Sequence, residues 1–113
     1  MSTKLLNPEH YLRQTICKCF DSSIVFMIGT TKESNGESSR WFKPYFFDDE
    51  DNPVRDGDIV EVGKMEMQDL IYLLVCSIGE GDIPRSVSVK DAKGDNINPD
   101  NLPDLIVLTA IKE

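Results

Sequence analysis

Apolar residues at helical spacing mark two segments of the chain. In the first, they recur at intervals of three or four residues, at Leu12, Ile16, Cys19 and Phe20. This period predicts a helix over residues 8–20, and Asn7 followed by Pro8 fits a helix cap and a first helical position. In the second segment, apolar residues fill most positions. They predict a helix over residues 64–78 that is apolar over most of its girth and must be well covered, by a sheet or by another chain.

Five shorter runs have the alternating or continuous apolar pattern of β-strands. They span residues 24–28, 40–47, 58–62, 85–90 and 105–111. Asn35-Gly36, in a polar loop between the first two runs, predicts a hairpin. Pro44 cannot donate a backbone hydrogen bond, so we expect a sheet edge or a bulge there. The last run is almost continuously apolar and predicts an interior strand.

The order of these elements indicates the fold class. Strands and helices do not alternate regularly, as they do in a doubly wound parallel sheet. The sequence therefore predicts an α+β protein with a mostly antiparallel sheet of about five strands covered by two helices. A chain of 113 residues fits one domain over residues 1–113.

The charge is strongly acidic and unevenly distributed. Twenty Asp and Glu against 12 Lys and Arg give a formal net charge of −8, which disfavours direct binding to nucleic-acid phosphates. Residues 1–47 carry six bases and four acids, a balance of +2, and residues 48–113 carry six bases and 16 acids, a balance of −10. The densest segment, residues 48–61, holds seven acids and Arg55 alone, a balance of −6.

This acidic segment has three interpretations. It could be a solvated turn, since Asp and Asn suit turns. It could bind a cation, but a calcium loop needs oxygen ligands and glycine where Pro53 and Val54 stand. It could also be a surface that recognises a basic partner. Under the third interpretation, the aromatic residues just before the acids supply interface anchors. The candidate binding residues are Trp41, Tyr45, Asp48, Asp49, Glu50, Asp51, Asp56, Asp58 and Glu61.

Residues suited to catalysis are scarce in this chain. A nucleophilic Ser or Cys needs a base, and the single histidine, His10, lies at the start of a helix in a polar setting. No phosphate-binding glycine loop is present. Cys17, Cys19 and Cys76 are an odd number and fit buried free thiols better than a disulfide framework or a metal site. The sequence therefore predicts a protein that is not an enzyme and has no cofactor and no metal.

The ends and the apolar runs bear on location. The first residues lack the apolar stretch of a secretory signal. The longest apolar run, residues 70–76, is far shorter than a membrane span. We therefore expect a cytoplasmic protein with no membrane contact.

Taken together, these features favour an acidic protein-binding module, an inhibitor or immunity-type protein. Its partner would be a basic protein, such as a nuclease toxin or another nucleic-acid-binding protein, whose groove it fills by mimicry of nucleic-acid charge. The alternative is a structural or assembly protein that forms a homodimer or larger homo-oligomer through residues 65–78 or 105–111. A regulatory domain that binds a small molecule or metal is the third class.

Overall fold

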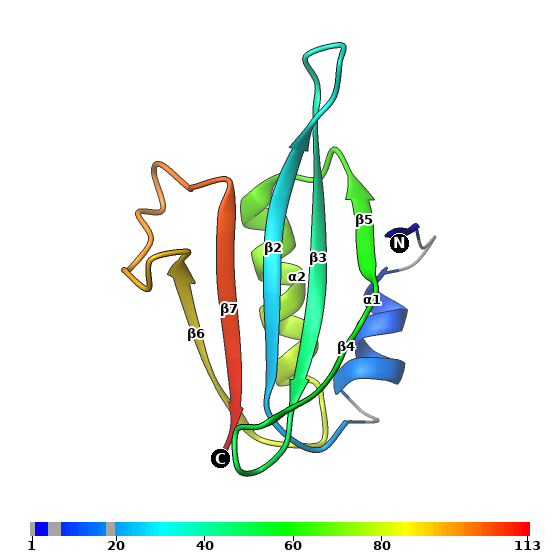
Figure 1. Ribbon diagram of the computed structural model, residues 1–113, viewed down its shortest axis with the longest axis vertical. Helices are drawn as coiled ribbons and strands as arrows, with labels where there is room; N and C mark the ends of the chain where they lie inside the picture. Colours follow the sequence, from blue (N-terminus) through cyan, green and yellow to red (C-terminus); the bar gives the residue numbers. More distant parts are fainter. Residues whose placement is uncertain (1, 5–7, 18–19) are drawn as a thin grey trace.

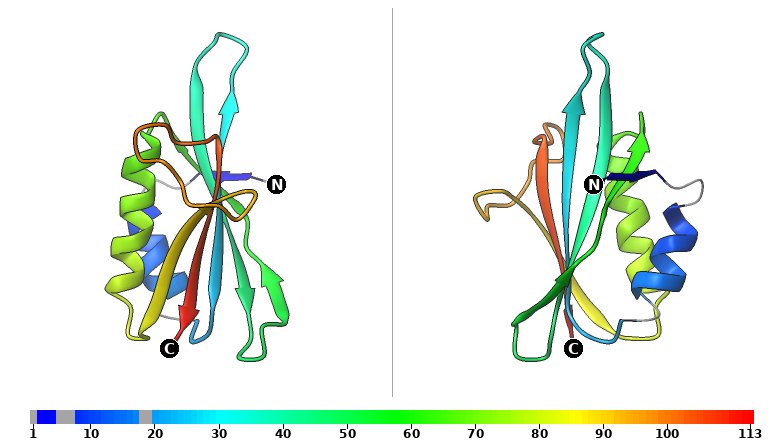
Figure 2. Two further views of the ribbon diagram at one scale, coloured as in Figure 1. Left: turned by 90° about the vertical axis from the view of Figure 1, so that its left-hand side faces the viewer. Right: turned by 45° about the vertical axis from the view of Figure 1, so that its right-hand side comes forward.

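The sheet and the helices form two layers, with the helices packed against one face of the sheet (Figure 1 and Figure 2). This computed structural model describes residues 2–4, 8–17 and 20–113. In chain order the elements are β1 (Ser2–Lys4), α1 (Pro8–Tyr11), the π-helix η1 (Leu12–Cys17), β2 (Ile24–Lys32), β3 (Ser38–Phe47), β4 (Pro53–Asp56), β5 (Ile59–Gly63), α2 (Met67–Gly79), β6 (Arg85–Asp91) and β7 (Leu105–Lys112). The predicted α+β class is confirmed.

The sheet is almost entirely antiparallel, as predicted. Six strands lie side by side in the order β1-β5-β3-β2-β7-β6, and β4 pairs with β3. Only β1 and β5, among the described strands, run parallel. The predicted hairpin of β2 and β3 and the interior position of β7, between β2 and β6, are confirmed.

Two strands were not predicted, β1 and β4. β4 has no alternating apolar pattern, and all four of its residues are exposed. It pairs with β3, and the Arg55 guanidinium lies over the Phe46 ring, 4.4 Å from the ring centroid. A cation on an aromatic face stabilises this strand in place of apolar burial.

The prediction of two regular helices was wrong, because α2 is the one long helix among the described residues. Residues 8–20 do not form a continuous α-helix: α1 has four residues and continues as the π-helix η1. A π-helix bonds residue i to i+5 and has a wider turn, so residues four and five apart share a face. Leu12, Ile16 and Cys17 follow this spacing and are fully buried. Asn7 and Cys19 lie outside the described residues.

The core lies between α2 and the sheet. Alternate residues of the central strands face the helix layer and are buried: Ile24, Phe26 and Ile28 of β2, Phe42, Pro44 and Phe46 of β3, and Ile106, Leu108 and Ala110 of β7. The rings of Phe26 and Phe42 meet edge to face, with centroids 5.9 Å apart. From α2, Leu70, Leu74 and Ile78 are buried against them. However, Tyr72 on the same helix is 71% exposed. The sheet layer therefore covers one side of this helix, and the expected cover by another chain stays a prediction.

Pro44 is accommodated by a break in the neighbouring strand. The expected edge or bulge is found in this strand. Pro44 is buried within β3, but it has no strand partner on the side away from β2, because β5 pairs with β3 up to Phe42 and β4 pairs with it from Tyr45. Register shifts lie on both sides of it, at Arg40/Trp41 and Phe46/Phe47. On the side away from β2, Gly57 donates its backbone N–H to the Pro44 carbonyl at 2.8 Å, in the gap between β4 and β5. A Cβ on Gly57 would lie 2.4 Å from the proline ring, so glycine suits this close approach.

The sheet ends at β6, which pairs with β7 alone among the named strands. After β6 the chain turns tightly, and the Asp91 carboxylate accepts the backbone N–H groups of Lys93 and Asp95. The chain then returns so that Asn96 forms a β-bridge with Lys90. One end of this edge strand is therefore closed by the chain's own turn.

Candidate interaction surface

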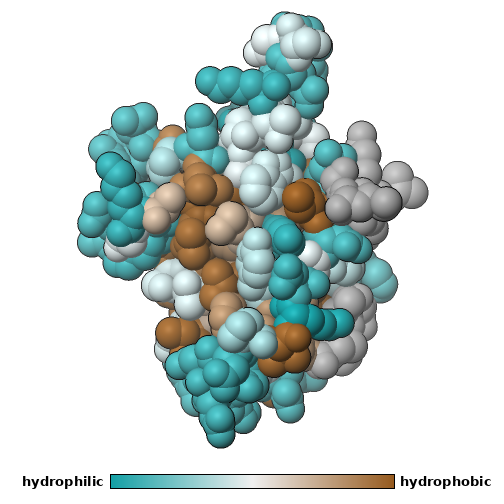
Figure 3. Space-filling view, in the orientation of Figure 1, coloured by the Kyte–Doolittle hydropathy of each residue, from teal (hydrophilic) through white to brown (hydrophobic). Residues whose placement is uncertain are grey.

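Among the residues that the structure describes, none forms a layer over the face of the sheet opposite the helices. Because side chains alternate along a strand, the residues between the buried ones project to this side. The apolar side chains that the three central strands present there are Val25 and Met27 of β2, Trp41, Tyr45 and Phe47 of β3, and Leu105, Val107 and Ile111 of β7. We call this set the uncovered face. Figure 3 shows it toward the viewer, with apolar surface gathered over β2 and β7.

Trp41 lies flat on the uncovered face, across the neighbouring strand. It is paired with Gly29 of β2, and a Cβ on Gly29 would stand 2.2 Å from Cζ2 of the indole. The glycine therefore leaves room for the ring, an arrangement in which an aromatic side chain shields a bare strand backbone. Trp41 is half-buried by this contact and keeps part of its ring exposed.

Two of the predicted acids stand beside the aromatic residues of this face. Asp56 is paired with Tyr45 across β4 and β3, and Glu61 is paired with Trp41 across β5 and β3. Directly opposed residues on neighbouring strands share a face. Lys43 lies between Trp41 and Tyr45 along β3. Its Nζ is 3.7 Å from the Asp56 carboxylate and 5.1 Å from the centroid of the Tyr45 ring. The structure therefore brings Trp41, Tyr45, Asp56 and Glu61 together.

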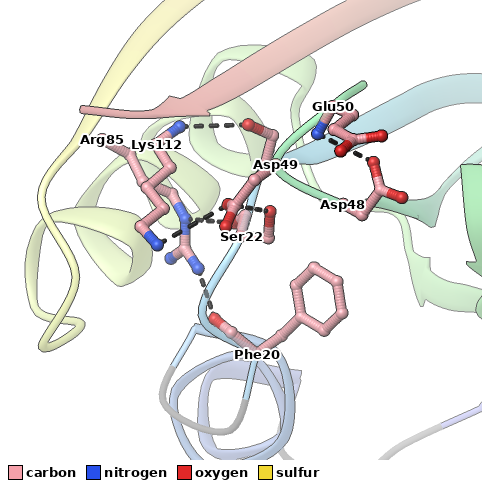
Figure 4. Close-up of polar contacts among 8 residues, drawn as sticks. Phe20, Ser22, Asp48, Asp49, Glu50, Arg85 and Lys112 are labelled. Carbon is pink, nitrogen blue, oxygen red and sulfur yellow. Dashed lines mark hydrogen bonds and ion pairs between the residues drawn. The ribbon is translucent and has the colours of Figure 1, made fainter. Parts of the chain in front are cut away.

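The acidic turn after β3 uses two of its carboxylates to hold its own shape (Figure 4). The Asp48 carboxylate accepts the backbone N–H groups of Glu50 and Asn52, both at 2.9 Å. Asp49 accepts the Ser22 hydroxyl at 3.0 Å and lies 3.6 Å from the Lys112 ammonium. Asp51 has a φ of 62°, which Asp tolerates better than most residues.

Glu50 and Asp51 are exposed acids at the tip of this turn, next to Asp49, which is exposed as well. Both views of Figure 2 show the turn curling to the side of the sheet away from the helices. The tip therefore stands on the same side of the molecule as the uncovered face. Asp58 is placed differently, because its negative charge acts on Tyr11 of the helix layer. The pKa of the Tyr11 phenol is raised mainly by burial and secondly by Asp58.

Sequence reasoning did not identify Val25, Met27, Phe47, Leu105, Val107 and Ile111 as surface residues. The sequence gives no signal for this, because apolar residues occupy both sides of β2, β3 and β7, and the alternation of side chains defines two faces without telling which one the helices cover. Five of these six side chains are half-buried, and Ile111 is 51% exposed.

A pH-dependent prediction follows from the Asp48 contacts. Its pKa is lowered mainly by the backbone hydrogen bond from Asn52. A carboxylate with a lowered folded-state pKa contributes stability above its unfolded-state pKa, and this contribution is lost as the pH falls through the folded-state value. Asp48→Asn keeps an accepting oxygen but removes the charge. We expect the wild type to melt at a higher temperature than Asp48→Asn at about pH 7, and at the same temperature at about pH 2. Thermal denaturation followed by circular dichroism measures this, and an equal gap at both pH values would contradict it.

The groups that could support chemistry lie apart from this surface. Burial raises the pKa of the Cys17 thiol to about 11, which leaves it protonated and unreactive at neutral pH. Within residues 2–4, 8–17 and 20–113, no group of three or more His, Cys, Asp or Glu side chains is arranged to hold a metal ion. No helix in the same part of the chain is long and apolar enough to cross a membrane.

Comparison with protein-family models, with curated proteins and with solved structures finds no match to this chain.

Proposed function

We propose that this protein is an acidic protein-binding module that captures a basic partner on its uncovered face. The observation that carries the proposal is the placement of Trp41 and Tyr45 on one face of the sheet with Asp56 and Glu61. A centre of aromatic and apolar side chains with a polar, charged rim is the usual anatomy of a protein–protein interface. A helix layer already covers the opposite face, so this is the face left for a partner.

The charge around the face supports a basic partner. Residues 48–61 carry seven acids. In the described part of the chain, the bases in contact with the segment are Arg55 within it, Lys43 beside Asp56 and Lys112 beside Asp49. Without Asp58, which acts on Tyr11 of the helix layer, six acids against three bases leave a formal charge of −3 at one side of the uncovered face. Such a field speeds association with a cationic protein and orients it. A nuclease or another nucleic-acid-binding protein has the basic groove that this arrangement fits, with carboxylates in place of phosphates.

Binding by matched variants tests the proposal. The first variant neutralises three exposed acids beside the face, as Glu50→Gln, Asp51→Asn and Glu61→Gln; the control neutralises three acids elsewhere, as Glu33→Gln, Asp82→Asn and Asp95→Asn. Asp48 and Asp49 are left intact because they hold the turn. Both variants have the same net charge, so any difference between them reports position and not total charge.

Each variant and the wild type are immobilised, a lysate of the source cells is passed over them at low and high salt, and a retained protein is purified for direct binding. We expect a basic protein whose affinity falls about tenfold for the first variant and much less for the control, with a weaker salt dependence. A retained protein that is not basic, or one that binds both variants equally, would contradict the proposal.

Self-association is the second candidate function. It is favoured by the apolar side chains that β7 contributes to the uncovered face, Leu105, Val107 and Ile111. Contiguous apolar surface of this kind is typical of interfaces. Sedimentation equilibrium separates the candidates: a stable dimer that Val107→Ser dissociates favours assembly, and a monomer favours capture of a different protein.

A further inference from the structure

A second apolar surface lies on the helix layer, away from the uncovered face. It is a groove of about 310 Å³ between the outer side of α2 and the segment that leads into β7. Its lining residues are Gln68, Ile71, Tyr72, Val75, Ile97, Pro99 and Leu102. Figure 2 shows this segment reaching from the top of β7 over toward α2. The volume is within the range of ligand pockets, about 300–1,000 Å³.

The groove has a firm floor and an exposed lip. Ile71, Ile97 and Leu102 are partly buried and pack against the core. Tyr72 is 71% exposed and Val75 37% exposed. The Gln68 side chain donates a hydrogen bond to the Pro99 carbonyl at 3.1 Å, which ties the helix to the segment. The floor is therefore built by the fold itself, and the lip is free to contact a ligand.

An acidic hollow of about 350 Å³ adjoins the groove at the start of α2, and the two share Gln68, Pro99 and Leu102. Among the described residues that line it, Arg40 is the one basic residue, and four carry carboxylates: Glu66, Asp69, Asp100 and Asp104. Four acids against one base give the hollow a formal charge of −3. An apolar site and a site for a cation thus lie end to end.

We propose that this composite groove binds a peptide segment in which apolar side chains lie directly next to Lys or Arg. The apolar side chains would occupy the groove beside Tyr72 and Val75, and the basic side chains would enter the acidic hollow. Charge complementarity selects this occupant, because the hollow disfavours an acidic or phosphorylated peptide. The groove shares no residue with the uncovered face, so the inference goes beyond the proposed function.

Fluorescence anisotropy with short labelled peptides tests this. The probe is the blocked tetrapeptide Leu-Leu-Arg-Arg, compared with Leu-Leu-Glu-Glu and Gly-Gly-Arg-Arg. We expect the first to bind most tightly. Tyr72→Ser with Val75→Ser should weaken its binding about tenfold, since these side chains form the lip. Asp100→Asn with Asp104→Asn should weaken binding about fivefold and reduce its salt dependence.

The controls are matched in kind. Val54→Ser removes an exposed valine away from the groove, and Asp82→Asn with Asp95→Asn neutralises two exposed acids outside the hollow. Both should leave peptide affinity unchanged. Equal binding of Leu-Leu-Glu-Glu, or full affinity in the Tyr72→Ser, Val75→Ser variant, would overturn the inference.

The outcome is separable from that of the proposed function. The variant neutralised at Glu50, Asp51 and Glu61 should bind the peptide as the wild type does, even where it loses a basic protein partner. Loss of peptide binding in that variant would place the peptide on the uncovered face and overturn the groove. A dimer dissociated by Val75→Ser would show that a second copy of the chain occupies the groove, and this too would overturn the inference.

Discussion

Replacing Phe26 by alanine is expected to lower the free energy of unfolding by about 3–5 kcal/mol. Phe26 of β2 is fully buried between the sheet and α2, and the centroid of its ring is 5.9 Å from that of the Phe42 ring. Removing a buried ring loses its transfer free energy and leaves a cavity that the fixed backbone cannot close. For a domain whose total stability is about 5–15 kcal/mol, this loss is a large fraction of the whole.

Met27→Ala is the matched control for this prediction. It is the next residue along the same strand, but its side chain lies on the uncovered face and is only half-buried. We expect this substitution to cost about 1 kcal/mol, because surrounding water fills the space that the side chain leaves. Urea denaturation of the two variants measures the difference. Equal losses in the free energy of unfolding for the two variants would mean that the uncovered face is covered as well.

Trp41→Ala is expected to weaken the capture of a partner on the uncovered face by about 2 kcal/mol or more, roughly thirtyfold. The indole spans two strands, from β3 across Gly29 of β2, and Tyr45 lies on the same face of β3. Such a ring buries a large area at low cost in conformational entropy, because it is already held in place.

Gly29→Ala provides a second variant that keeps the indole in the protein. The added Cβ would stand 2.2 Å from the ring, so Trp41 must leave its position. We expect this substitution to reproduce much of the affinity loss of Trp41→Ala, whereas Val87→Ser, on the edge strand β6, leaves affinity unchanged. Isothermal titration with the purified partner measures all three. Full affinity in both Trp41→Ala and Gly29→Ala would show that the partner binds elsewhere.

Much of the fold was predictable because it depends on local periodicity. The short apolar runs at residues 24–28 and 105–111 and the helical spacing from Met67 to Ile78 each give correct elements, because the length of a run and the spacing of apolar residues are properties of neighbouring residues. The four exposed residues of β4 carry no such signal, since that strand depends on pairing with β3 and on the Arg55–Phe46 contact. The π-helix was missed because α-helical and π-helical spacing both allow residues four apart to share a face.

The candidate site was predictable only in part. The acids of residues 48–61 form one run in the sequence, yet the structure divides them among three roles. Asp48 and Asp49 hold a turn, Asp58 acts on Tyr11, and the remaining acids stand near the uncovered face. A charge count along the chain cannot make this division, because it depends on where Ser22 and Lys112 lie in space.

The turn that follows β6 has a consequence for how the protein behaves at high concentration. An open strand edge is a template on which further chains can stack into fibrils. Here Asn96 already occupies the position beside Lys90, so an incoming strand could add only along the stretch from Arg85 to Ser88. The few backbone hydrogen bonds along so short a stretch would bind an added strand only weakly. The protein can therefore keep a broad apolar face available to a partner while its nearest sheet edge resists uncontrolled polymerisation.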